Sequence, residues 1–115
     1  MKQAERDNDQ LGVILHYCDR LEESVCCFGD SYDLFTSLTP FQDSCALCLI
    51  QIGEAVNRIS DDFKRVHPEI DWRRIYGMRC HLVHGYEMFD AEIAWDAMKR
   101  HIPSLKEFCL DHFEE

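Results

Sequence analysis

The stretch TPFQDSCALCLIQIGEAVNRIS, residues 39–60, has the periodicity of a long amphipathic helix. Its apolar side chains recur at alternating spacings of four and three: Phe41, Cys45, Cys48, Ile52, Ala55 and Ile59. Thr39 is a suitable cap, and Pro40 suits the first helical position, where the missing N–H would have no partner in any case. The stretch therefore predicts a helix that ends near Ser60.

The preceding part of the chain repeats the same pattern. Its apolar positions are Leu11, Ile14, Cys18, Leu21, Val25 and Phe28. Asp7 or Asn8 is available as the N-cap of this helix, and Gly29 as its stop. The pair Asp30-Ser31 then predicts the cap of a short helical turn through Leu38.

The second half of the chain continues with helices. Ser60-Asp61-Asp62 caps a short polar segment that Pro68 interrupts, and Asp71 caps WRRIYGMRCHLVH, which Gly85 can terminate. Asp90 can cap the last helix, in which Pro103 predicts a kink or a local break. Its looser apolar stripe is Ala94, Met98, Ile102, Leu105 and Cys109.

These patterns predict an all-α bundle of four main helices plus short helical segments, because no convincing strand run occurs. A length of 115 residues fits a single domain, 1–115. Surplus apolar surface on the two long helices makes a homodimer plausible. No run reaches the roughly 20 apolar residues of a membrane span, and the N-terminus lacks a secretory signal. We therefore expect a soluble cytoplasmic protein with no membrane partner.

Most of the seven cysteines (Cys18, Cys45, Cys48 and Cys109) fall on apolar stripes of helical segments and are interpreted as small buried hydrophobes in a reducing compartment. Cys45-Ala-Leu-Cys48 has redox or metal spacing, but it lies in mid-helix and has no second pair. The net charge of −10 argues against non-specific binding of nucleic acid. Residues 57–86 nevertheless hold six basic and four acidic residues, which leaves a local basic surface on an acidic chain.

The stretch MRCHLVHGY, residues 78–86, gathers side chains suited to phosphate chemistry. Histidine can take a proton from a ribose 2′-hydroxyl or give one to a leaving 5′-oxygen, and arginine stabilises the charged phosphorane. Arg79 and His84 could therefore cleave RNA without a metal. On a straight helix, however, they are separated by about 140° and about 7.5 Å of rise. Either the helix ends at His84 or the site is assembled from more than one chain.

Structural roles for the same residues stay open. A histidine near a helix C-terminus is favoured by the helix dipole, Arg79 can be an ion-pair partner, and Tyr86 can cover the end of the bundle. His81 and His84 have the spacing of a metal pair, but the nearest carboxylates, Glu87 and Asp90, stand beyond the predicted end of this helix at Gly85. We therefore expect no metal site and no cofactor.

The spacing of Arg79, His84 and Tyr86 resembles the R-x-x-x-x-H-x-Y signature of HepT-type toxins in the HEPN superfamily, which are compact all-α ribonucleases. Four residues separate the arginine from the histidine, and one separates the histidine from the tyrosine. The resemblance extends over GEAVNRIS (53–60), HPEIDWRRIYGMR (67–79), LVHGY (82–86) and the Asp90-x-x-Ile-x-Trp95 pattern.

The resemblance implies a metal-independent endoribonuclease whose catalytic arginine and histidine, here Arg79 and His84, meet across a homodimer interface. It implies a type II toxin–antitoxin system in which an MNT-type nucleotidyltransferase antitoxin adenylylates Tyr86. Further RNA contacts are expected from Arg73, Arg74 and His81.

One position departs from the family pattern. A polar residue, often asparagine, frequently follows the motif arginine, and this chain has Cys80 there. Because a thiol is a poor hydrogen-bonding group, the role of that amide is lost or replaced, with His81 as a candidate. Cys80 and the acidic surface support an alternative function, a non-catalytic helical partner of a nucleotidyltransferase.

Overall fold

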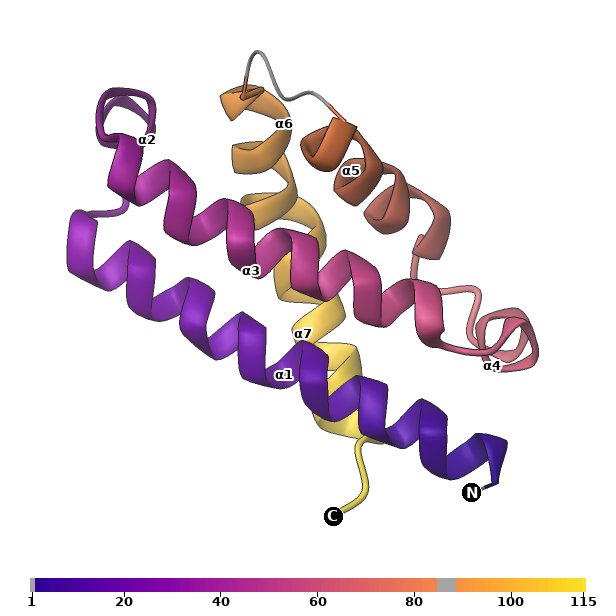
Figure 1. Cartoon of the computed structure of the whole chain (residues 1–115). Coiled ribbons are helices and arrows are strands. Elements are labelled where there is room, and N and C mark those ends of the chain that lie inside the picture. The colour runs from indigo at the N-terminus through magenta and orange to yellow at the C-terminus, as the bar shows by residue number, and fades with distance from the viewer. Residues whose placement is uncertain (1, 85–88) are drawn as a thin grey trace.

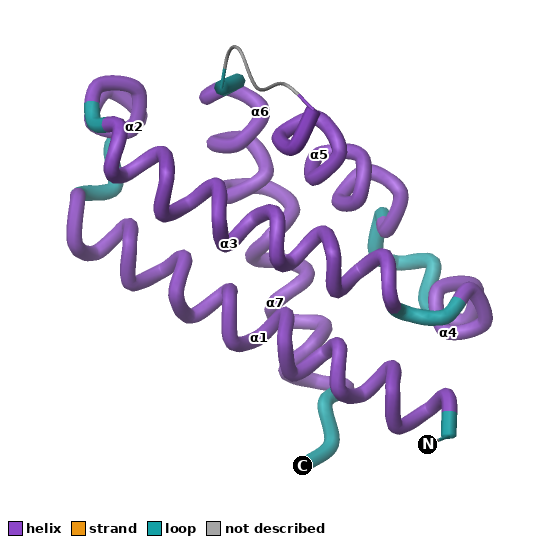
Figure 2. The backbone as a smooth tube through the Cα atoms, viewed as in Figure 1, coloured by secondary structure: helices purple, strands orange, loops and turns teal. Residues whose placement is uncertain are grey.

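The structure, a computed structural model, describes residues 2–84 and 89–115. Every regular element within these ranges is helical (Figures 1 and 2). In chain order the helices are α1 (Gln3–Phe28), α2 (Tyr32–Ser37), α3 (Thr39–Arg58), α4 (Asp61–Val66), α5 (Trp72–His84), α6 (Ala91–Asp96), the π-helical turn η1 (Ala97–His101) and α7 (Ile102–His112). The predicted all-α fold of four main helices with short additional segments is confirmed.

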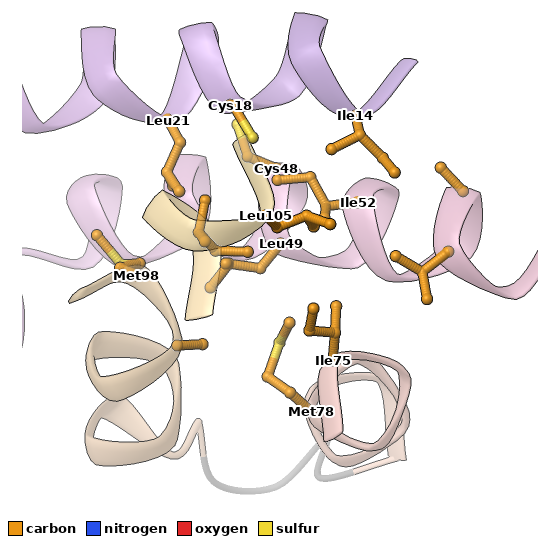
Figure 3. Close-up of a cluster of buried hydrophobic side chains, with 14 of the residues drawn as sticks. Ile14, Cys18, Leu21, Cys48, Leu49, Ile52, Ile75, Met78, Met98 and Leu105 are labelled. Carbon is orange, nitrogen blue, oxygen red and sulfur yellow. The ribbon is translucent and has the colours of Figure 1, made fainter. Parts of the chain in front are cut away.

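The long helices α1 and α3 lie side by side and run in opposite directions, with α2 at the turn between them (Figure 1). Helix α5 packs on α3, and α7 packs on α1. Side chains from all of these helices meet in one buried cluster (Figure 3). Its labelled members are Ile14, Cys18, Leu21, Cys48, Leu49, Ile52, Ile75, Met78, Met98 and Leu105. The predicted apolar stripes therefore form the core.

The helix caps expected from the sequence are mostly present. The Ser31 hydroxyl accepts a hydrogen bond from Leu34 N–H (3.3 Å), and the Ser60 hydroxyl accepts one from Phe63 N–H (3.2 Å). The carboxylates of Asp71 and Asp90 cap α5 and α6, each accepting at 3.1 Å from the backbone N–H three residues later. Gly29 ends α1 with a φ of 118°, a conformation that glycine adopts without strain.

Two predicted caps were wrong. Helix α1 begins at Gln3, so Asp7 and Asn8 lie inside it. Asp7 is buried and accepts hydrogen bonds from the backbone N–H (2.8 Å) and the hydroxyl (2.7 Å) of Ser60. This carboxylate therefore joins α1 to the α3–α4 junction instead of capping a helix. The second wrong cap is Thr39. Helix α3 begins at Thr39, one residue earlier than predicted, so Leu38 holds the cap position.

The region around Pro103 is helical but irregular. The predicted distortion lies just before the proline, where η1 replaces α-helical bonding and Ile102 N–H bonds to the Ala97 carbonyl. Pro103 itself occupies the first turn of α7, where no intrahelical N–H is required. A wider π turn lets the chain continue from α6 into α7 without a full break.

The buried cysteines behave as the sequence predicted. Burial raises the pKa of the Cys18, Cys45 and Cys109 thiols to about 12 and also raises the pKa of Cys48. These thiols therefore stay protonated near neutral pH, which argues against redox chemistry at Cys45 and Cys48. Within the described ranges, no helix is both long and apolar enough to cross a membrane.

Candidate active site on α5

Helix α5 carries the candidate catalytic residues, and its apolar face fixes its orientation. Trp72, Ile75 and Met78 are buried at spacings of three along this face. The Trp72 indole N–H also donates to the His67 carbonyl oxygen at 2.9 Å, which anchors the start of the helix. The polar side chains of α5 are therefore held in defined directions around a rigid axis.

Arg79 lies at the closest approach of α5 to α3. A methyl group built on Gly53 of α3 would stand only 2.2 Å from Arg79 Cβ and 2.7 Å from its Cγ. Since real Cβ atoms do not approach so closely, only glycine at position 53 lets the two helices pack at this distance. The stem of Arg79 consequently lies over the backbone of α3.

The Arg79 guanidinium is held by three neighbours within the same chain. Its Nε forms an ion pair with Glu54 of α3 without the geometry of a hydrogen bond, and its Nη1 lies 3.8 Å from the Cys80 sulfur. Its Cζ stands 5.7 Å from the centroid of the Tyr76 ring. Contact with Cys80 and the charge of Glu54 raise the pKa of Arg79, so this group stays cationic.

Cys80 takes part in this cluster despite its departure from the family pattern. Hydrogen bonding to Cys80 raises the pKa of Tyr76, and the same sulfur lies 3.8 Å from Arg79 Nη1. The expected substitute, His81, is directed elsewhere: its Nε2 lies 3.6 Å from Asp90 Oδ2 at the start of α6. The sulfur, and not His81, therefore contacts Arg79.

His84 is the last residue of α5 and is exposed. The helix is continuous from Arg79 to His84, so the separation of about 140° that the spacing implies applies within one chain. Arg79 faces α3 with only 19% of its side chain exposed. The two candidate catalytic residues therefore leave α5 in different directions. Gly85 and Tyr86, the expected helix stop and modification site, lie outside the described residues.

The expected RNA contacts are divided between two surfaces. Arg74 and His81 line one groove of about 880 Å³ that runs between α5 and the α6–η1 segment. Trp95, Lys99 and Arg100 line the same groove, and Lys99 Nζ lies 4.7 Å from the Trp95 ring centroid. Arg73 is exposed but does not line this groove. Cationic and aromatic side chains thus line it together with two acidic ones, Glu92 and Asp96.

Gly77 also lines the groove, and it differs from the glycines that mediate helix contacts. A methyl group at Gly53 or Gly12 would meet Arg79 or Phe113, whereas one at Gly77 would meet nothing within 4 Å. A glycine inside a helix costs about 1 kcal/mol relative to alanine. No packing within the described chain requires Gly77, so the space above it is open to a molecule from outside.

Sequence reasoning missed two residues that position Arg79. Gly53 and Glu54 stand within the GEAVNRIS stretch, but they were treated there only as part of a family pattern. The available signal was a glycine inside an otherwise strong helix, which often marks a close helix approach. The groove residues Trp95 and Lys99 gave no such signal, because only the tertiary fold brings α6 and η1 beside α5.

Comparisons with known proteins agree with this architecture. Residues 14–111 match a family model described as "Ribonuclease HepT-like". The chain is 51% identical over 108 residues to "Probable ribonuclease HepT" from Thermococcus cleftensis, covering 92% of this chain and 93% of that protein. It is 32% identical over 96 residues to a protein named "Putative RNase" from Caldanaerobacter subterraneus subsp. tengcongensis, covering 84% of each.

No solved structure matches the chain. The family model spans most of the sequence, including both α3 and α5 with Glu54, Arg79 and His84. The chain therefore belongs to the HepT-like ribonuclease family.

Proposed function

We propose that this protein is a metal-independent endoribonuclease that acts in the cytoplasm as a homodimer, with Arg79 and His84 as its catalytic residues. The observation that carries the proposal is the separation of these residues within one chain. Arg79 is held against α3 by Glu54, whereas His84 is exposed at the end of α5. A second copy that docks against the end of α5 would bring the histidine of one chain to the arginine of the other.

The chemistry of the two residues fits cleavage of an RNA phosphodiester. His84 of one chain removes the proton from the 2′-hydroxyl, whose oxygen attacks the phosphorus, and the bond to the 5′-oxygen breaks. His84 of the second chain protonates the departing 5′-oxygen. Arg79, cationic at any physiological pH, stabilises the negative charge on the phosphorane oxygens.

The groove beside α5 supports the proposal, because it offers a path for the RNA strand. Arg74, Lys99 and Arg100 supply positive charge, and the Trp95 ring offers a surface on which a base can stack. The groove also has acidic members, Glu92 and Asp96, which weaken its attraction for non-specific polyanions. Arg73, one residue from Arg74, extends the basic surface outside the groove.

The catalytic proposal is tested by incubating purified protein with RNA in excess EDTA at 25 °C and following product formation. We expect cleavage to persist, because neither Arg79 nor His84 needs a metal for its proposed role. Sedimentation of the same sample should give a dimer. An inactive dimer that still forms a stoichiometric complex with a nucleotidyltransferase would instead favour the alternative function, a non-catalytic helical partner. Cys80 on the Arg79 guanidinium is the observation that favours this alternative.

The biological role that we propose is that of the toxin in a type II toxin–antitoxin system. An MNT-type nucleotidyltransferase would act as the antitoxin by transferring adenylate to the Tyr86 hydroxyl. A bulky anionic group two residues beyond His84 would occupy the space of the substrate phosphate and repel it. The modification would therefore inhibit cleavage in two ways, by blocking the substrate site and by repelling the substrate phosphate.

Modification is predicted to depend on Tyr86 alone. After coexpression with an MNT-type nucleotidyltransferase, we expect the intact mass to rise by one or more adenylate units, all mapped to Tyr86, with loss of RNA cleavage. Tyr86→Phe should gain no mass and stay active, whereas Tyr76→Phe, which removes a tyrosine of α5, should still be modified. Adenylate found on Tyr76, or modified protein with full activity, would contradict the prediction.

A further inference from the structure

Three metal-binding side chains meet at the opposite end of α5 from His84. His67 follows α4, Glu69 lies in the α4–α5 connection, and His112 is the last residue of α7. One ligand atom from each lies within 4.8 Å of the others. The fold therefore brings together three donors from two segments more than 40 residues apart, whereas the sequence alone offered the pairs Cys45–Cys48 and His81–His84.

His112 is oriented as a metal ligand. Its ring stacks on Phe108, with centroids 4.0 Å apart and planes 20° apart, and its Nδ1 lies 2.8 Å from the Phe108 carbonyl oxygen. Since a carbonyl oxygen only accepts, Nδ1 carries the proton in the neutral ring and Nε2 keeps its lone pair. A backbone carbonyl on one ring nitrogen is the usual support of a histidine that binds metal through the other.

His67 is also fixed in place. Its half-buried ring packs on Phe63 and Phe108 at centroid distances of 4.6 and 5.1 Å. Its backbone oxygen is held by the Trp72 indole, and its ring centroid lies 4.8 Å from that of His112. Glu69 Oε2 stands 3.7 Å from His67 Nδ1 and supplies the negative charge of the cluster.

We propose that His67, Glu69 and His112 bind a divalent transition metal of the zinc type. Two imidazole nitrogens and one carboxylate oxygen form a ligand set that suits Zn²⁺, with water completing a tetrahedron. Adjacent ligand atoms in such a site are about 3.4 Å apart, as follows from Zn–N and Zn–O bonds of about 2.1 Å. Rotation of the exposed Glu69 side chain provides its part of the required approach.

The proposed metal would join the end of α7 to the α4–α5 connection. The 13 residues of α5 place about 18 Å of helix between the beginning of α5 and His84. The metal would therefore stabilise the fold without taking part in RNA cleavage. The C-terminal tail is already held nearby, because Asn8 exchanges two hydrogen bonds with the backbone of Glu114.

The test is calorimetric titration of ZnCl₂ into protein that has been treated with EDTA and dialysed. Cys26 and Cys27 are exposed, so both are first replaced by serine to remove their thiols as competing ligands. In this Cys26→Ser, Cys27→Ser background, we expect one Zn²⁺ per chain and a higher thermal midpoint with zinc. Glu69→Gln and His112→Phe should each weaken binding by at least about tenfold, since each removes a ligand.

His16→Phe is the matched control, because His16 is an exposed histidine on α1 and is no part of the cluster. It should bind zinc like the parent. His112→Phe keeps an aromatic ring on Phe108, and the exposed Glu69→Gln change keeps the side chain's shape, so circular dichroism should show both variants folded. Absence of zinc binding in the parent, or affinities in the two variants equal to that of His16→Phe, would overturn the proposal.

Discussion

His84→Ala is expected to lower the rate constant of RNA cleavage by about 10²–10⁴-fold, the contribution typical of a general acid–base group. The fold should be unaffected, since His84 is exposed at the last residue of α5. The measurement is single-turnover cleavage of a labelled RNA, with the oligomeric state and the thermal midpoint of the variant determined in parallel.

His81→Ala provides the control for this experiment. His81 is a second exposed histidine on the same helix, three residues earlier, and it is paired with Asp90. As an RNA contact it should affect binding more than the cleavage step, so its single-turnover rate at saturating protein should stay near that of the parent. Equal rates for the two variants would remove His84 from the catalytic site.

Gly53→Ala is expected to be the most damaging single-methyl change near the site. The new Cβ would lie 2.2 Å from Arg79 Cβ, an atom bonded directly to the backbone of α5 and unable to rotate away. Helix α5 would have to move, at a cost of about 1–3 kcal/mol or more in the free energy of unfolding. Because the movement displaces Arg79 from Glu54, RNA cleavage should fall as well.

Gly77→Ala is the matched change for Gly53→Ala. It adds the same methyl group to α5, where nothing described lies within 4 Å, so it should leave stability unchanged or raise it by up to about 1 kcal/mol. Urea unfolding of both variants provides the comparison. If Gly53→Ala were as stable as Gly77→Ala, α3 and α5 would not be in the close contact described here.

The helices were predictable because their signals are local. Apolar spacings and the capping side chains of Ser31, Ser60, Asp71 and Asp90 depend only on residues a few positions apart. The prediction that Asp7 caps a helix was wrong because the hydrogen-bond partner of Asp7 is distant in the sequence. Its partner, Ser60, lies 53 positions away, and a polar side chain before an apolar stripe has the same appearance whether it caps a helix or is buried.

The candidate site was predictable in its residue types but not in its geometry. The sequence identified Arg79 and His84 and the angle between them, because helical geometry fixes that angle. It did not reveal the pairing of Arg79 with Glu54 or the groove with Trp95, since both depend on how α5 packs against distant segments. The proposed homodimer is harder still to derive, because a single chain's sequence specifies a partner surface only through surplus apolar area.

The ion pair between Arg79 and Glu54 has a consequence for which anions the site accepts. The guanidinium already has a carboxylate neighbour in the same chain, so a phosphate that binds there must replace or share that neighbour and does not meet an uncompensated charge. An exchange of one anion for another gains less than a first pairing. Isolated phosphate and chloride ions should therefore compete weakly, while a polynucleotide held at several other points can complete the exchange. Under the proposed function, one glutamate on α3 would thereby favour long substrates over small ions.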